Sequence, residues 1–158
     1  MGILVDGYYE TYLDRAADAG GRAYWTEQMV AGMSQSVLAT SFLASKEYIA
    51  RNLSYTTYVN SLYERVLGRD SETAGRDYWV GRLENGLSRA DAVVAFVQSA
   101  EKRTRVIDYY YDELLDRTVT ADEIARHLAT IEGSNDTLND VIETILASDE
   151  YFAKAYGA

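Results

Sequence analysis

The sequence predicts an all-α protein in which tandem helical repeats pack into one compact, bundle-like array. Three observations predict this class. A Tyr-Trp pair recurs after 54 residues, apolar residues follow the helical period, and no run of alternating polarity is long enough for a strand. The 158 residues include no proline, so helices can run uninterrupted and the turns must be made by Gly, Ser, Asn and Asp.

An internal repeat defines the expected domain organisation. Residues 9–51 align with residues 63–105 without a gap, and 14 of the 43 positions are identical. A third copy follows at an offset of 48 to 49 residues, but Arg126-His127 stands where the Tyr-Trp pair would fall. Terminal repeats are often atypical because they cap an array. We therefore expect one compact unit made of repeat one (1–54), repeat two (55–105) and a degenerate, acidic capping repeat (106–158).

Each repeat is expected to contain three or four short helices. Gly32 and Gly86 are predicted to follow the last turn of a helix, where a left-handed residue is needed. Thr120-Ala121-Asp122-Glu123 has the pattern of a capping box, with a hydroxyl at the N-cap and a carboxylate three residues on. Other helices are predicted to begin near Asp18 and Ser71 and at Ser34, Ser45, Ser88, Ser99 and Ser148.

The net charge of −10 is distributed unevenly along the chain. Residues 1–105 carry 13 acidic and 12 basic side chains, whereas residues 106–158 carry 12 acidic and 3 basic ones. Proteins that bind nucleic acid need a basic face, so this composition argues against a nucleic-acid partner. The acidic last third favours a solvated surface, and it also allows a basic partner or a divalent cation there.

Missing residue types exclude several chemistries. The chain has no cysteine, which rules out disulfides, zinc-thiolate sites and thiol catalysis. His127 is the one histidine, so a histidine-based triad would have to use it and a multi-histidine metal site cannot form. A half-buried structural role is favoured for this residue. Phosphate-binding glycine motifs are absent, and we expect no cofactor. No apolar run approaches the ~20 residues of a membrane span, and residues 1–7 show no cleavable signal.

The segment of residues 62–101 carries a recognisable motif. In order, it comprises Leu62-Tyr63, Leu67-Gly68-Arg69, an acidic residue at Glu72, Gly75, Tyr78-Trp79, Gly86-Leu87-Ser88, and Phe96 followed by Ser99 and Glu101. This motif resembles the bacterial family named domain of unknown function 4214. Residues 12–48 resemble it more weakly, since Asp14 stands where the motif has glycine. The proline that usually precedes the acidic residue is also absent, and Ala17 and Ser71 stand there.

The resemblance implies where the protein is located and does not imply which reaction it could catalyse. Members of the family occur mostly in bacterial secreted or surface proteins, often beside calcium-binding repeats, and they also occur in phage proteins. The motif is distantly similar to the helical domains of phycobilisome linkers, whose role is assembly. An extracellular or cell-surface location, or alternatively a virion, is what the resemblance implies for this chain.

Aromatic side chains are the first candidates for contact with a partner. The Tyr-Trp pairs, Tyr24-Trp25 and Tyr78-Trp79, could form an aromatic platform for a sugar. Recurrence at helical spacing favours the alternative, in which the tryptophans anchor the core of their repeats. The 14 tyrosines could also enrich an interface, and the better candidates for that role are Tyr109 and Tyr110, beside Tyr111.

Charged residues that end the first helix of each repeat are the second group of candidates. Arg15 and Arg69, with Asp18 and Glu72 three residues on, could form a ligand pocket, although a salt bridge at the helix end is favoured. Asp18, or Asp70 with Glu72, is also a weak candidate for binding calcium. The spacing of an EF-hand is absent, so no metal site is predicted.

These observations favour a protein that binds or assembles over an enzyme. The leading hypothesis is a non-catalytic interaction module of a bacterial secreted or cell-surface system, with a protein or a surface polymer as partner. The alternative is a structural subunit of a larger assembly, such as a surface layer or a phage particle, which would self-associate. A carboxylate-based hydrolase is the third hypothesis, because acidic side chains are abundant and no pair of them stands out.

Overall fold

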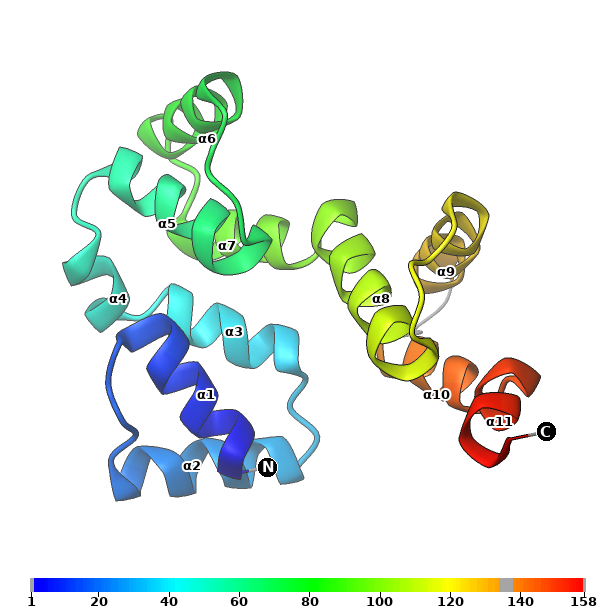
Figure 1. Ribbon diagram of the computed structural model, residues 1–158. Helices are drawn as coiled ribbons and strands as arrows, with labels where there is room; N and C mark the ends of the chain where they lie inside the picture. Colours follow the sequence, from blue (N-terminus) through cyan, green and yellow to red (C-terminus); the bar gives the residue numbers. More distant parts are fainter. Residues whose placement is uncertain (1, 134–137, 158) are drawn as a thin grey trace. The chain divides into compact units, whose positions relative to one another are not determined.

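The computed structural model describes residues 2–133 and 138–157, and over these residues the protein is all-α with no strand (Figure 1). This confirms the predicted fold class. No helix in this part of the chain is both long and apolar enough to cross a membrane. The described helices are α1 (Gly2–Leu13), α2 (Ala19–Val30), α3 (Gln35–Leu43), α4 (Lys46–Arg51), α5 (Tyr55–Leu67), α6 (Thr73–Glu84), α7 (Arg89–Val97), α8 (Ala100–Leu115), α9 (Ala121–Gly133), α10 (Leu138–Leu146) and α11 (Asp149–Tyr156).

Helix packing divides the protein into two compact units, residues 1–98 and residues 99–158. This differs from the single compact unit that we expected from the repeats. The expected boundary after residue 54 does coincide with the start of α5, but the helices on its two sides share one core. The expected boundary after residue 105 lies inside α8, and the second unit begins instead at Ser99, the N-cap of that helix.

The length of α8 explains this difference. In repeat one, α4 ends at Arg51 and a short linker leads to α5. After Ser99 the matching segment is one continuous helix of 16 residues. The last helix of repeat two and the first helix of the third repeat are therefore fused. The span Lys46–Leu67 becomes Ala100–Leu115, which is six residues shorter, and the offset between repeats falls from 54 to 48.

The capping signals form as predicted. In the capping box, the N–H of Glu123 donates to Oγ1 of Thr120 at 3.3 Å, and the N–H of Thr120 donates to Oε2 of Glu123 at 2.9 Å. Gly32 and Gly86 have φ angles of 100° and 96°, which confirms their position just past a helix. The predicted serine N-caps that accept a hydrogen bond from a backbone N–H three residues on are Ser34, Ser45, Ser88, Ser99 and Ser148.

The core of unit 1 joins repeat one to repeat two through one face of α5. Tyr58, Leu62 and Val66 form this α5 face and are almost completely buried. The Tyr58 hydroxyl donates a hydrogen bond to the backbone oxygen of Leu43 at 3.0 Å, and the Tyr58 ring lies 6.0 Å from the ring of Tyr48. Repeat one therefore supplies part of the surroundings of these buried side chains, and the two repeats share one core.

Unit 2 has a separate, smaller core. Its partly buried edge includes Leu115 and Leu128. Because each unit has its own core, each can unfold as its own cooperative unit. The buried residues of this second core are Ile107, Tyr111, Ile131, Val141 and Ile145.

Candidate functional site

An arginine that follows the first helix of each repeat lies over a tyrosine ring of that same helix, and we call this pair the arginine clasp. The residue before each arginine is left-handed, with φ angles of 47° at Asp14, 61° at Gly68 and 52° at Asp116. This residue ends the helix and turns the chain, so the guanidinium folds back onto the ring. The distances from guanidinium carbon to ring centre are 4.7 Å for Arg15 and Tyr9, 4.9 Å for Arg69 and Tyr63, and 4.8 Å for Arg117 and Tyr111.

The clasp of repeat one is closed by a carboxylate from α4. Nε and Nη2 of Arg15 donate to the two carboxylate oxygens of Glu47 at 2.8 and 2.9 Å. The guanidinium stabilises the charged carboxylate and so lowers the pKa of Glu47. Asp18 lies 3.7 Å from Arg15 and caps α2 by accepting a hydrogen bond from the N–H of Gly21 at 2.8 Å. These groups hold the turn between helices, which is the structural role that the sequence favoured for them.

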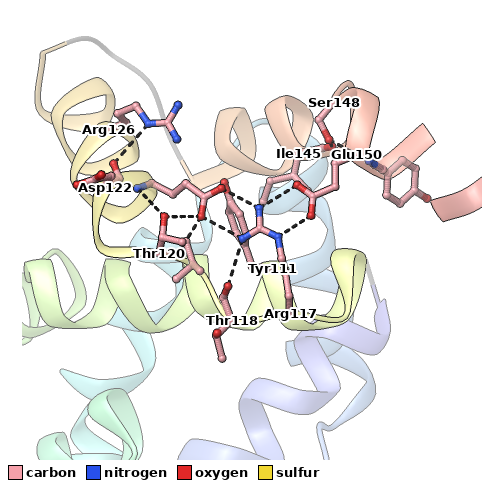
Figure 2. A network of polar contacts seen from close by, with 12 residues as sticks. Tyr111, Arg117, Thr118, Thr120, Asp122, Arg126, Ile145, Ser148 and Glu150 are labelled. Atoms are coloured by element: carbon pink, nitrogen blue, oxygen red, sulfur yellow. Dashed lines mark hydrogen bonds and ion pairs between the residues drawn. The ribbon is translucent and has the colours of Figure 1, made fainter. Parts of the chain in front are cut away.

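In the third repeat, Arg117 donates hydrogen bonds to two carboxylates (Figure 2), whereas Arg15 donates to the carboxylate of Glu47 and lies 3.7 Å from that of Asp18. Its Nε and Nη2 donate to Glu150 at 2.5 and 2.8 Å, and its Nη1 and Nη2 donate to Glu123 at 3.0 and 2.7 Å. The hydrogen bonds from Arg117 lower the pKa of Glu123 to about 2 and also lower the pKa of Glu150. Both carboxylates are therefore ionised at neutral pH.

In the first two repeats, the tyrosine hydroxyl of the clasp rests against a glycine of the following helix. The hydroxyl of Tyr9 meets Gly21, and the hydroxyl of Tyr63 meets Gly75. A β-carbon at either glycine would overlap the hydroxyl oxygen, so a larger residue fits only if the ring moves. This contact explains why a glycine recurs four residues before each tryptophan.

The tryptophans pack against a phenylalanine beside the clasp. The ring of Trp25 lies 5.4 Å from that of Phe42, and the ring of Trp79 lies 5.0 Å from that of Phe96. Both indoles are partly buried against the core of unit 1, which places them in the packing role. The neighbouring tyrosines remain exposed, Tyr24 at 53% and Tyr78 at 55%.

All three of these packing positions change in the third repeat. Glu123 stands at the glycine position, His127 at the tryptophan position and Ile145 at the phenylalanine position. An imidazole is smaller than an indole, and an isoleucine side chain is smaller than that of phenylalanine, so among the described residues these side chains leave part of the space beside Tyr111 unfilled. A cavity of about 330 Å³ opens there.

The lining of this cavity combines core side chains with polar groups. The apolar part comes from Leu115, Ile131, Val141 and Ile145. A small concave site with a few hydrogen-bonding groups over an apolar surface suits a small polar ligand. The polar part of the lining is Tyr111, Glu123, Arg126, His127, Thr130, Asp140, Thr144, Ser148 and Glu150.

Tyr111 and His127 are hydrogen-bonded to each other in this lining. The hydroxyl oxygen lies 3.0 Å from Nε2, and the tautomer of the imidazole decides which group donates. Burial, followed by the nearby charge of Arg126, lowers the pKa of His127, and burial raises the pKa of Tyr111. Both side chains are thus neutral at pH 7 and can exchange hydrogen bonds with a ligand.

Arg126 supplies a positive charge to the same lining. Its Nε donates to the backbone oxygen of Asp122 at 3.4 Å (Figure 2). Within the residues that the structure describes, Arg126 forms no ion pair. Its guanidinium is consequently able to donate hydrogen bonds to a ligand oxygen.

The remaining candidates from the sequence do not form one site. Tyr109 is exposed, whereas Tyr110 packs on the core of unit 2. Nη1 of Arg69 lies 3.9 Å from Glu72, which is a loose pair at a helix start. No three acidic or imidazole groups gather as a metal site anywhere in the described ranges, and this includes the weak calcium candidates Asp18, Asp70 and Glu72.

The cavity is the feature that sequence reasoning missed. Arg126-His127 at the Tyr-Trp position predicted a degenerate repeat and a half-buried histidine, and His127 is half-buried. The additional signal was the isoleucine at the position of Phe96. Trp79 and Phe96 contact each other in repeat two, and the third repeat has smaller side chains at both positions. Replacing both partners of one contact leaves a cavity, because the surrounding structure relaxes only in part.

Fold and site together define an all-α repeat protein with two aromatic-filled repeats and a third repeat that is hollow. The family model described as domain of unknown function (DUF4214) matches residues 4–51 and 39–106. These segments span more than half of the chain, and the protein belongs to this family. Most of the third repeat lies beyond the matched segments. No curated protein and no solved structure matches the chain.

Proposed function

We propose that this protein is a non-catalytic interaction module of a bacterial secreted or cell-surface system, and that the cavity of the third repeat binds a group of its partner. The observation that carries the proposal is the replacement of Trp79 and Phe96 by His127 and Ile145. Two repeats fill this position with aromatic rings, whereas the third opens a cavity of about 330 Å³ with hydrogen-bonding groups in its lining.

The chemistry of the lining favours a sugar unit of a surface polymer as the ligand. Hydroxyl, carboxylate and guanidinium groups can each bond to the hydroxyls of a sugar, and the apolar part of the lining can contact its ring carbons. The lining includes a donor at Arg126, a hydroxyl at Thr144 and a carboxylate acceptor at Glu150. A polar side chain of a protein partner is the second class of ligand that such a lining could bind.

A hydrolase is less well supported by the same geometry. A glycosidase needs a carboxylic acid that stays protonated near neutral pH, and that requires a raised pKa. Glu123 and Glu150 line the cavity, but their bonds to Arg117 lower both pKa values. We therefore propose binding rather than hydrolysis for this site.

A variant that fills the cavity tests the proposal. His127→Trp with Ile145→Phe restores the residue types of the first two repeats, so the fold has a precedent within the chain. The wild type and this variant are applied to an array of bacterial glycans, and a sugar that binds is then titrated by calorimetry. We expect the filled variant to lose binding while its circular dichroism spectrum is retained.

A matched control distinguishes the cavity from the aromatic platform. Tyr24→Ala with Tyr78→Ala removes two exposed rings far along the chain from the cavity, and we expect it to bind as the wild type does. Loss of binding in this control, together with full binding by the filled variant, would move the site to unit 1 and contradict the proposal.

A further inference from the structure

One face of α1 is only partly covered by the residues that the structure describes, since Leu4, Tyr8 and Tyr12 on it are half-buried against the core of unit 1. It forms a groove of about 390 Å³, and Ile3 at its edge is 86% exposed. The other sides of α1 pack on α2, α3 and α4. We call this groove the head face, and its lining is Ile3, Leu4, Gly7, Tyr8, Thr11 and Tyr12.

The corresponding face of α5 shows what such a surface accepts. At the offset of 54 residues, Leu4, Tyr8 and Tyr12 correspond to the three residues of the α5 face. The α5 face is buried, and at Tyr58 it contacts both the end of repeat one, at Leu43 and Tyr48, and Arg89 at the start of α7. The Tyr48 hydroxyl lies 2.8 Å from Oγ of Ser61 on α5. The backbone oxygen of Leu43 accepts a hydrogen bond from the hydroxyl of Tyr58. At the corresponding surface of repeat two, one occupant is thus the last part of the preceding repeat.

The third repeat ends in side chains of the same kind. Leu146 and Tyr151 stand at the positions of Leu43 and Tyr48. Repeat two carries Lys102 at the tyrosine position, so this match belongs to the third repeat and not to every copy. The chain thus repeats, at its acidic end, the two residues that dock repeat one onto repeat two.

These side chains are accessible at the end of unit 2. Leu146 is 37% exposed and Phe152 is 50% exposed. The rings of Phe152 and Tyr156 stack at 5.9 Å with 18° between their planes. A run of exposed apolar and aromatic side chains is a surface suited to a protein partner. We call Leu146, Tyr151, Phe152 and Tyr156 the tail face.

We propose that the tail face of one copy binds the head face of a second copy, in the arrangement by which repeat one packs on the α5 face. The two faces differ, so the association is heterologous, and each bound copy presents a further free face. The net charge of −10 opposes association, and added salt should strengthen it by screening. This inference goes beyond the proposed function, because neither face includes a residue that lines the cavity.

Light scattering over a range of protein concentrations tests this inference on the full chain. The wild type should exceed the monomer mass of 17.7 kDa and pass twice that mass as its concentration rises. Ile3→Glu places a charge in the head face, and Phe152→Glu places one in the tail face. Both residues are exposed, so each variant should keep the circular dichroism spectrum of the wild type, and each should be monomeric.

Mixing the two variants gives the decisive result. The Ile3→Glu copy keeps its tail face and the Phe152→Glu copy keeps its head face, so the equimolar mixture should form dimers and nothing larger. Leu53→Glu, at a residue that is 77% exposed and outside both faces, should assemble as the wild type does. A wild type that is monomeric at every concentration, a single variant that still assembles, or a mixture that stays monomeric would each overturn the inference.

Discussion

The hydroxyl oxygen of Tyr63 lies so close to the position that a β-carbon on Gly75 would take that there is no room for that β-carbon. Tyr9 and Gly21 make the same contact in repeat one. In the third repeat the tyrosine is kept but the glycine becomes Glu123, which turns to Arg117. The two repeats that have the tyrosine–glycine contact also have an aromatic-filled core, and the third repeat, which lacks this contact, has the cavity.

Gly75→Ala is expected to lower the free energy of unfolding of unit 1 by about 1–3 kcal/mol, because the new methyl group must displace the Tyr63 ring. Urea denaturation followed by tryptophan fluorescence measures this change. Trp25 and Trp79 are the two tryptophans of the chain and both lie in unit 1, so this signal reports on that unit.

Two comparisons separate the clash from a general effect of alanine. Gly81 lies on the same helix and an added β-carbon meets nothing within 4 Å, so Gly81→Ala should be neutral or stabilise by about 0.4–1 kcal/mol. In a Tyr63→Phe background the colliding oxygen is gone, and Gly75→Ala should cost less there. An equal loss in both backgrounds would assign the effect to the helix and not to the tyrosine.

Features that depend on a few neighbouring residues could be predicted from the sequence. A serine N-cap such as Ser88 bonds to the backbone three residues on, and Gly86 needs only its own positive φ. The capping box of Thr120 and Glu123 is equally local. Each of these elements depends on residues within about one helical turn of one another, so the sequence pattern alone predicts them.

Features that depend on contacts between helices could not be predicted in the same way. The role of Gly75 requires knowing that the ring of Tyr63 reaches α6. The cavity requires knowing that Trp79 and Phe96 touch, since only then does their joint replacement leave a space. The second unit follows from the fusion that makes α8, and its trace in the sequence was the fall in offset from 54 to 48.

Arg117→Lys is expected to destabilise unit 2 by about 1 kcal/mol. A lysine ammonium cannot make paired hydrogen bonds to Glu123 and Glu150 at once, nor lie flat over the Tyr111 ring. The effect is modest because Glu150 is about half exposed, and solvent screens that pair. Urea denaturation followed by circular dichroism measures it, and the transition seen by tryptophan fluorescence should stay in place.

Salt and a matched arginine provide the controls for this prediction. Raising the ionic strength should shrink the difference between Arg117→Lys and the wild type, because screening weakens exposed ion pairs. Arg126→Lys, at an arginine that makes no ion pair among the described residues, should leave the stability of unit 2 within about 0.5 kcal/mol of the wild type. A larger loss at Arg126 than at Arg117 would contradict the importance assigned to the clasp.

The stability of unit 2 should fall in two separate ranges as the pH is lowered. Burial places the pKa of His127 below its ordinary value of 6.5 in the folded protein. As the pH falls through 6.5, the unfolded chain therefore binds a proton that the folded chain does not, and the free energy of unfolding decreases. Glu123 has a folded pKa of about 2 against an ordinary 4.5, so its contribution is lost as the pH falls from 4.5 toward 2.

His127→Gln separates the two ranges, because glutamine can bond to Tyr111 but does not titrate. The variant should show a flat stability between pH 7 and pH 5.5, where that of the wild type declines, and both proteins should then lose stability below pH 4.5. Circular dichroism during urea denaturation at each pH gives the measurement. If the wild type were equally stable at pH 7 and pH 5.5, the imidazole would be free to take up its proton in the fold. The cavity around Tyr111 would then be open enough for water to solvate a charged His127, and its lining would gain one positive charge as the pH falls below 6.5.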